Sequence, residues 1–260
     1  MNCHRFTQDA YCDGVAAEVA LLAGLTKDAD PATPVPSCPK WPVSELLVHT
    51  GWVHRWAAGM VAKVAPARLD IEREELDLPD HPADHPVWLA AGGEALVDTL
   101  RRADPEAPMW AWGADQHARF WPRRMLHETT VHRVDAQLAL GLAPTVDTAV
   151  AVDGVDEFLE NLPCARWAPH RKELRGNGES LALVAADAGV RWLIRLERDR
   201  FTWAHLEEPG AVTAEGAVTV EGAAADLYLL MWGRWRPDDE RFAVAGDRKV
   251  LDHWAAHSAI

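Results

Sequence analysis

The sequence has few cysteines, and none of them lies in a C-x-x-C pair. The four are Cys3, Cys12, Cys38 and Cys164. A chain of 260 residues is long enough to bury a stable core without disulfides or a structural metal. We therefore expect reduced cysteines that act as small apolar residues, and we expect any bound metal to serve function rather than folding.

Long apolar runs and an excess of basic residues are also missing. No apolar run approaches the ~18 residues of a membrane-spanning helix, and the segment after Met1 lacks the basic start and apolar stretch of a signal peptide. Asp and Glu total 40 against 26 Lys and Arg, a formal net charge of −14. Such a surface repels nucleic-acid phosphates and anionic lipids. We expect a cytoplasmic monomer or homodimer that binds a small molecule, and neither nucleic acid nor membrane.

The first half of the chain has the hydrophobic spacing of helices. Pro122 fits the first turn of the last helix and Gly141 fits its C-terminal stop. An acidic, proline-punctuated loop is expected between the second and third helices, at 70–86. The other three expected helices, bounded by prolines, are 5–26, 43–64 and 87–102.

From about residue 149 the pattern changes to short β-rich runs separated by turn residues. The expected strands are 180–186, 190–196, 201–206 and 217–220, and the expected helices are about 150–161, 226–232 and 250–257. The boundary between the two patterns falls near residues 144–148. We predict a mixed two-domain fold, with a four-helix bundle over residues 1–146 and a smaller α+β domain over residues 147–260.

Histidine and carboxylate spacing suggests a metal site on the fourth helix. Glu128 and His132 are four residues apart, about 6 Å along one helix face, so they can share an ion. His127 lies roughly 140° around the helix from His132 and fits poorly. Asp135 is a candidate to orient the His132 imidazole, or an ordinary charge partner. By itself, the Glu128–His132 pair is also compatible with a solvated pair or a core histidine.

A third ligand is available on the second helix. His49 begins a stripe that we take as the inner face of the bundle, whereas His54 is expected to point elsewhere. The other members of the stripe are Trp52, Val53, Trp56 and Met60. The alternative for His49 is a core histidine bonded to a backbone carbonyl. Bundle cores that receive His and Glu from facing helices are a known way to build a metal site.

Several motifs also carry a family resemblance over essentially the whole chain. They are Cys38-Pro-Lys-Trp41, Leu46 to Trp56, Phe120-Trp-Pro-Arg-Arg124, His127 to Asp135, Val220 to Arg234 and Val244-Ala-Gly-Asp247. The sequence resembles the mycothiol-dependent maleylpyruvate isomerase family. This resemblance implies a DinB-like four-helix bundle followed by a sterol carrier protein-like domain.

The resemblance places the metal ligands of the family on His49, Glu128 and His132, the trio that helical spacing also selects. Three such ligands leave an open position, as in catalytic sites, with Zn²⁺ favoured and Ni²⁺ or Fe²⁺ as alternatives. The implied cosubstrate is mycothiol, whose thiolate adds to a cis double bond and leaves from the trans product. Stopping after addition would make the protein an S-transferase. Lys40 and Pro42 depart from the family pattern at the entry to the second helix.

Arg234 matches the Gly-Arg motif of the family, which implies that it reaches an anionic substrate or the thiol at the domain junction. The alternative is a cation that completes a helix C-terminus. Trp110, Trp112 and Trp121 are expected on the loop before the fourth helix, either lining a pocket or packing in the core. His81 and His85 lie in the acidic loop and are expected to be solvated.

Three functions are consistent with these patterns. The leading one is a metal-dependent, mycothiol-using isomerase or S-transferase. A non-enzymatic protein that binds metal and an apolar ligand is one alternative. A metal-dependent hydrolase, in which water takes the open position, is the other.

Overall fold

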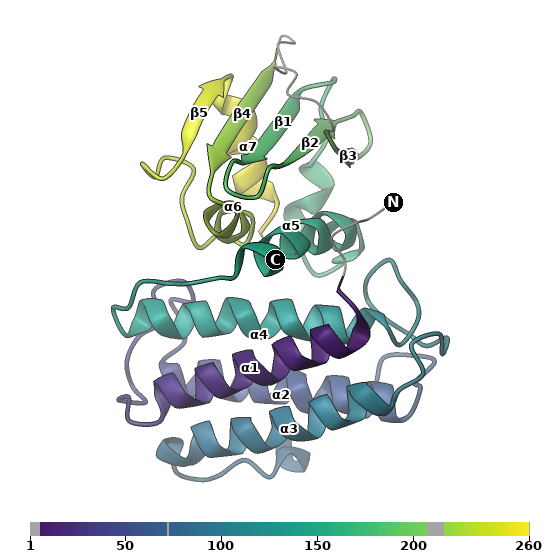
Figure 1. The fold of residues 1–260 in the computed structure, drawn as a ribbon, viewed down its shortest axis with the longest axis vertical. Helices are drawn as coiled ribbons and strands as arrows, with labels where there is room; N and C mark the ends of the chain where they lie inside the picture. Colours follow the sequence, from purple (N-terminus) through teal and green to yellow (C-terminus); the bar gives the residue numbers. More distant parts are fainter. Residues whose placement is uncertain (1–5, 72, 207–215, 260) are drawn as a thin grey trace. The chain divides into compact units, whose positions relative to one another are not determined.

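The computed structural model describes residues 6–71, 73–206 and 216–259, which fall into two compact units, residues 1–145 and 146–260. The N-terminal unit is helical and the C-terminal unit combines helices with one sheet (Figure 1). This agrees with the predicted mixed fold. No helix within the described residues is long and apolar enough to cross a membrane.

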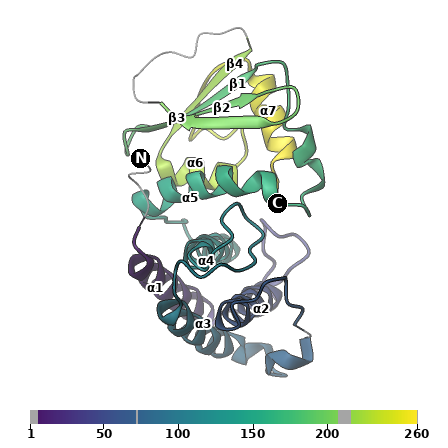
Figure 2. The ribbon, with the colours of Figure 1, turned by 90° about the vertical axis from the view of Figure 1, so that its right-hand side faces the viewer.

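In the described part of the N-terminal unit, four α-helices pack together, and Figure 2 shows them nearly end-on as a bundle. Each helix contacts two neighbours, so that α1 and α2 both pack between α3 and α4. The helices are α1 (Gln8–Thr26), α2 (Val43–Ala62), α3 (His85–Arg102) and α4 (Phe120–Ala139). Gly141 has a φ of +68°, so it ends α4 as the sequence predicts.

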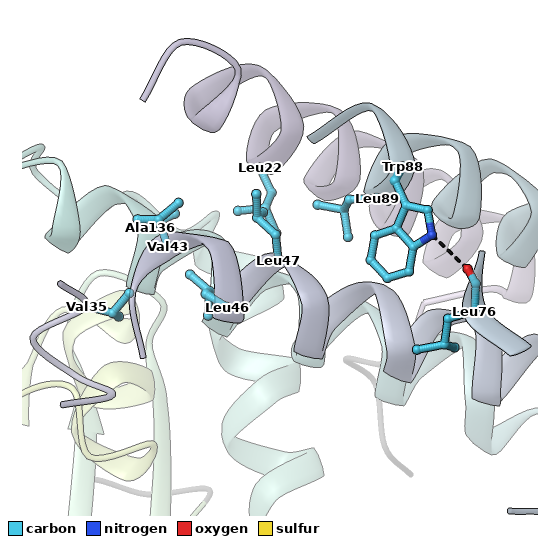
Figure 3. Packing of buried hydrophobic residues seen from close by; sticks show 9 residues of the cluster. All are labelled: Leu22, Val35, Val43, Leu46, Leu47, Leu76, Trp88, Leu89 and Ala136. Carbon is cyan, nitrogen blue, oxygen red and sulfur yellow. Dashed lines mark hydrogen bonds between the residues drawn. The ribbon is translucent and has the colours of Figure 1, made fainter. Parts of the chain in front are cut away.

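The apolar core between α1, α2 and α3 follows the helical spacing of the sequence. Leu22, Leu47 and Leu89 converge from the three helices (Figure 3). Trp88 lies beside them and its indole Nε1 donates a 2.9 Å hydrogen bond to the carbonyl of Leu76. A Cβ atom on Gly51 would stand 2.2 Å from the Trp88 ring. Glycine at this position therefore allows α2 and α3 to approach closely.

The loop expected at 70–86 ends two residues earlier than predicted and is partly structured. It contains two single-turn 3-10 segments, η1 (Arg73–Leu76) and η2 (Pro82–Asp84), and α3 already begins at His85 with a proline in its first turn. His85, expected to be solvated, is buried: its Nε2 lies 3.3 Å from the carbonyl oxygen of Pro79, and its ring packs 6.4 Å from Trp88. The helix can begin this early because Pro86 lies in its first turn, where a backbone N–H would have no partner within the helix.

Val64 ends α2 in a strained backbone conformation and supplies a stability test. Its φ is +42°, and its side chain is 45% exposed. A β-branched residue in this left-handed region costs about 1–2 kcal/mol, so Val64→Gly should raise the free energy of unfolding by up to about 1 kcal/mol. Val87→Gly, at an exposed position within α3, should lower it. Urea titration measures both, and a less stable Val64→Gly protein would contradict the assignment of strain.

The C-terminal unit is built on a five-stranded sheet with the order β3-β2-β1-β4-β5. Strands β1 and β4 are parallel and the other neighbours are antiparallel. Helices α5 and α6 lie side by side (Figure 2), and both α6 and α7 contact β1 and β4. The strands are β1 (Ser180–Ala185), β2 (Val190–Leu196), β3 (Phe201–His205), β4 (Ala217–Gly222) and β5 (Ala243–Gly246), and the helical segments are α5 (Thr148–Asn161), η3 (Leu162–Cys164), η4 (Pro169–Glu173), α6 (Ala224–Met231) and α7 (Arg248–His257).

A buried polar network joins α5 to the sheet of the C-terminal unit. The carboxylate of Asp156 accepts a 2.6 Å hydrogen bond from the Trp192 indole, and its two oxygens lie 3.0 and 3.2 Å from Nε2 of His205. Asp156 is 1% exposed and Trp192 is fully buried. The hydrogen bond with Asp156 is the main reason that the pKa of His205 is raised. The buried carboxylate of Asp156 is therefore paired with an indole N–H and an imidazole nitrogen inside this unit.

The cysteines agree with the sequence analysis where they are described. Cys12, Cys38 and Cys164 form no disulfide, and Cys3 lies outside the described residues. Cys12 is buried in the bundle, and burial is the main reason that the pKa of its thiol is raised to about 11. A thiol that stays protonated at neutral pH is a poor nucleophile.

Candidate metal centre

Side chains from two facing helices of the bundle meet at one carboxylate. Oε1 of Glu128 on α4 lies 3.4 Å from Nε2 of His49 on α2 and 3.2 Å from Nε2 of His132, one turn further along α4. The two imidazole rings are 5.0 Å apart and nearly perpendicular. One ligand atom from each of the three residues lies within 4.8 Å of the others. The structure thus brings together the three residues that the sequence singled out.

The spacing and chemistry of these groups fit a divalent transition metal. Bonds of 2.0–2.1 Å to nitrogen and oxygen set neighbouring ligands of a tetrahedral ion about 3.3 Å apart. The two measured separations, 3.4 and 3.2 Å, match this spacing. Two imidazoles with one carboxylate are a donor set used for zinc and for non-haem iron. Three protein ligands leave a position for a further molecule.

Asp135 contacts one of these imidazoles, which agrees with the orienting role that is one of its two expected roles. Its Oδ2 lies 3.0 Å from Nδ1 of His132, and its carboxylate is fully buried. Ser37 donates a 2.6 Å hydrogen bond to Oδ1, and the Cys38 thiol lies 3.8 Å from Oδ2. Because the carboxylate holds the proton on Nδ1, it directs the Nε2 lone pair of a neutral His132 toward Glu128. Ser37 was not predicted, since its loop carries no periodic pattern.

Charge at the centre favours an ionised Glu128. Burial alone would raise the pKa of this carboxyl, but hydrogen bonds with His132 and His49 hold it well below its usual range. Arg124 adds a contact of 3.4 Å between its Nη2 and Oε2 of Glu128. Burial would lower the pKa of His132, but its bonds with Asp135 and Glu128 raise it to about 9. A metal ion must therefore displace the Nε2 proton of His132 to bind.

One aromatic ring lies against the centre, and others pack along α2. The Trp41 ring lies 4.6 Å from the His49 ring and 6.2 Å from the His132 ring. Further along α2, Trp52 and Trp56 stack with nearly parallel rings 5.8 Å apart. Trp121 was expected on the loop before α4, but it is the second residue of that helix and is fully buried 5.2 Å from Trp56. Its burial fits the core-packing alternative of the sequence analysis rather than the lining of a pocket.

Two further histidines on α2 and α4 are buried outside this group. His54 was expected to point away from the inner face, yet it is fully buried, and its Nε2 lies 2.9 Å from the Thr129 hydroxyl. The prediction was wrong because α2 contacts both α3 and α4, so that more than one stripe of α2 is covered. Burial lowers the pKa of His54 to about 4. His127 is also fully buried and, as predicted, does not belong to the group of three.

Arg234 lies in the C-terminal unit, just beyond α6. Its backbone N–H bonds to the carbonyl of Leu229, after Gly233 has turned the chain with a φ of +70°. Its Nη1 donates a 2.7 Å hydrogen bond to the carbonyl of Trp232 at the end of the helix. This contact fits the helix-completing alternative. A role toward substrate or thiol stays a prediction.

Asp135 offers a test of the orienting contact. Asp135→Asn keeps the shape of the side chain but loses the charge that holds the His132 proton, so we expect metal affinity to fall about 10- to 100-fold. Ser37→Ala should give a smaller loss in the same direction. Asp98→Asn, at an exposed position of α3, serves as the control. Competition with a chromophoric chelator measures the affinities, and unchanged affinity in Asp135→Asn would contradict the assignment.

Comparisons with known proteins agree with this architecture. Residues 13–137 match the family model described as the mycothiol maleylpyruvate isomerase N-terminal domain, and residues 149–253 match the model of the C-terminal domain of the same family. No curated protein sequence matches the chain.

Two similar solved structures are crystal structures of the mycothiol-dependent maleylpyruvate isomerase. One has 14% sequence identity and a TM-score of 0.61, and the other, a variant with one histidine replaced by alanine, has 13% identity and a TM-score of 0.62. Each match covers 92% of this chain and 93% of the other. At such low identity these two structures show a shared fold, whereas the family models together span most of the chain. The protein belongs to the mycothiol-dependent maleylpyruvate isomerase family, a family of enzymes.

Proposed function

We propose that the protein is a metal-dependent enzyme that uses a low-molecular-weight thiol, mycothiol, to act on a small electrophile by isomerisation or S-transfer. The proposal is supported by one observation: the imidazoles of His49 and His132 both lie close to Oε1 of Glu128, in a chain that matches both domains of the family. Zinc is the favoured ion, and nickel and iron are the alternatives.

The side chains around the centre are suited to hold an ion and a thiol together. When bound, a divalent metal supplies positive charge that converts a coordinating thiol into its nucleophilic thiolate near neutral pH. Asp135 and Ser37 fix the ring of His132, and Arg124 restrains the second oxygen of Glu128. Trp41 places an apolar ring 4.6 Å from the imidazole of His49.

The proposed reaction begins when the thiolate sulfur forms a bond to one carbon of an electron-poor cis double bond. The electron pair of the double bond moves onto the conjugated acceptor, and the remaining carbon–carbon single bond rotates. The carbon–sulfur bond then breaks, which restores the double bond in the trans form and regenerates the thiolate. An S-transferase would instead protonate the adduct and release it. Arg234 is proposed to bind an anionic group of the substrate or the thiol.

The proposal is tested with a cobalt-substituted protein. Adding mycothiol should produce a sulfur-to-metal charge-transfer band, and binding should weaken as pH falls, because only the deprotonated sulfur is a good ligand. The metal-loaded enzyme should then isomerise maleylpyruvate or conjugate a small electrophile only when the thiol is present. A cobalt spectrum that did not change when thiol was added would contradict the proposal. Ester or amide cleavage would then identify a hydrolase, and lack of turnover with a co-purified apolar ligand would identify a binder.

The proposed role of Arg234 has its own readout. Arg234→Ala should reduce turnover while the metal content stays unchanged. Arg236→Ala, at an exposed position two residues later, is the matched control. Equal activity in the two variants would contradict a role of Arg234 toward the substrate or the thiol.

A further inference from the structure

Three histidines of the C-terminal unit gather where α7 passes the η4 segment. His253 and His257 are one turn apart on α7, and their ring centroids are 4.4 Å from each other. The ring of His170, from η4, lies 6.2 Å from that of His257. His170 is exposed and the other two are partly exposed, so an ion from solution can reach them. None of the three belongs to the group around Glu128.

Hydrogen bonds already fix which nitrogen of each α7 histidine is available. Nε2 of His253 lies 2.8 Å from the carbonyl oxygen of Glu173, and Nδ1 of His257 lies 2.7 Å from the carbonyl oxygen of His253. A carbonyl oxygen only accepts, so each of these nitrogens carries a hydrogen. In the neutral rings the lone pairs are therefore on Nδ1 of His253 and Nε2 of His257. Metal-binding histidines have this arrangement, with one nitrogen bonded to a carbonyl and the other left for the ion.

From this geometry we propose that His253, His257 and His170 form a second binding site, for a divalent transition-metal ion. Two imidazoles one helical turn apart present neighbouring donors on the same face. As the rings lie, the three histidines do not bring one nitrogen each within ligand distance of the others, so the exposed ring of His170 has to turn toward His257 to complete the site. Neutral imidazole suits Zn²⁺, Ni²⁺ and Cu²⁺, and affinity should rise from Ni²⁺ to Cu²⁺. Hard ions such as Mg²⁺ and Ca²⁺, which prefer oxygen ligands, should not bind.

The site would tie together two segments that are distant in the sequence. His170 lies near the start of the C-terminal unit, whereas His253 and His257 lie on its last helix. The Glu173 carbonyl already joins η4 to α7 through its hydrogen bond with His253. Binding of one ion by both segments should raise the free energy of unfolding of this unit, because the unfolded chain does not hold the three rings together.

Zinc stoichiometry in the full-length protein tests the proposal. By equilibrium dialysis, the wild-type protein should bind two equivalents of Zn²⁺ and the Glu128→Ala, His132→Ala double variant should keep one. In that double-variant background, His253→Ala or His257→Ala should abolish the remaining equivalent, and His170→Ala should weaken it by more than about tenfold. His81→Ala, which changes an exposed histidine of the other unit, is the control. A protein that bound no zinc at Glu128 could still bind one equivalent at the three histidines of the C-terminal unit. The experiment therefore tests the two sites independently.

A melting experiment gives a second readout. In the same background, Zn²⁺ should raise the melting temperature of the protein, and His257→Gln should remove this shift while the circular dichroism spectrum without metal stays unchanged. A zinc equivalent and a melting shift that both survive in His253→Ala and His257→Ala would overturn the site. Unchanged affinity in His170→Ala would overturn the three-histidine assignment.

Discussion

Replacing Glu128 by glutamine should remove most of the bound metal and lower thiol-dependent turnover by roughly a thousandfold or more. Oε1 of Glu128 lies within 3.4 Å of both imidazole Nε2 atoms, so it is the one atom that both histidines approach. A neutral amide keeps the shape of the side chain but is a weak ligand for zinc. The Lewis-acid contribution that would be lost is several kcal/mol, and each 1.36 kcal/mol is a factor of ten in rate. Metal analysis and a mycothiol-dependent assay on the same preparation measure both effects.

Neighbouring histidines provide the controls for this prediction. His49→Ala and His132→Ala should match the effect of the Glu128 variant on metal content. His54→Ala and His127→Ala should keep the metal, although both remove buried side chains and should lower the free energy of unfolding. Full metal occupancy in the Glu128→Ala, His132→Ala double variant would show that the ligands are elsewhere.

Helical periodicity was enough to select the three candidate ligands. Glu128 and His132 share a face because they are four residues apart, and His49 lies on a stripe of apolar residues that turns inward. Periodicity gave no such information for Ser37 and Trp41. The loop that carries them is held by a hydrogen bond from the Val35 N–H to the Trp41 carbonyl and by a bridge between Pro34 and Pro42. Contacts of that kind depend on the folded chain and leave no repeating pattern in the sequence.

The errors in the predicted fold have similar causes. Strands β1 to β4 were found because their β-branched and apolar residues form distinct runs between turns. Strand β5 was missed because Ala243 to Gly246 is a mostly exposed edge strand of small residues, with only β4 beside it. His54 was misplaced because one stripe was taken for the whole buried surface of α2, and the number of neighbouring helices is set by the tertiary structure.

Asp156→Ala should destabilise the C-terminal unit by about 3–5 kcal/mol, because it breaks a buried, paired network. The substitution leaves the indole N–H of Trp192 buried without its 2.6 Å acceptor and takes the carboxylate away from His205. Asp156→Asn keeps an acceptor for Trp192 and should cost less. Asp252→Ala, at an exposed position of α7, is the control. Urea unfolding followed by tryptophan fluorescence and circular dichroism measures the loss, and a stability equal to that of the control would contradict the role of the network.

The same network should make stability depend on pH in a defined direction. The hydrogen bond between His205 and Asp156 is the main reason that the pKa of His205 is raised above the ordinary value of about 6.5. A raised pKa in the folded state means that the stabilisation is fully present below about pH 6.5 and is lost as pH rises through the folded-state pKa. His205→Gln removes this contribution, so the difference in unfolding free energy between wild type and variant should be largest near pH 5.5 and shrink toward pH 9. A difference that grew with pH would mean that His205 is neutral in the folded protein, and that Asp156 is stabilised mainly by the indole of Trp192.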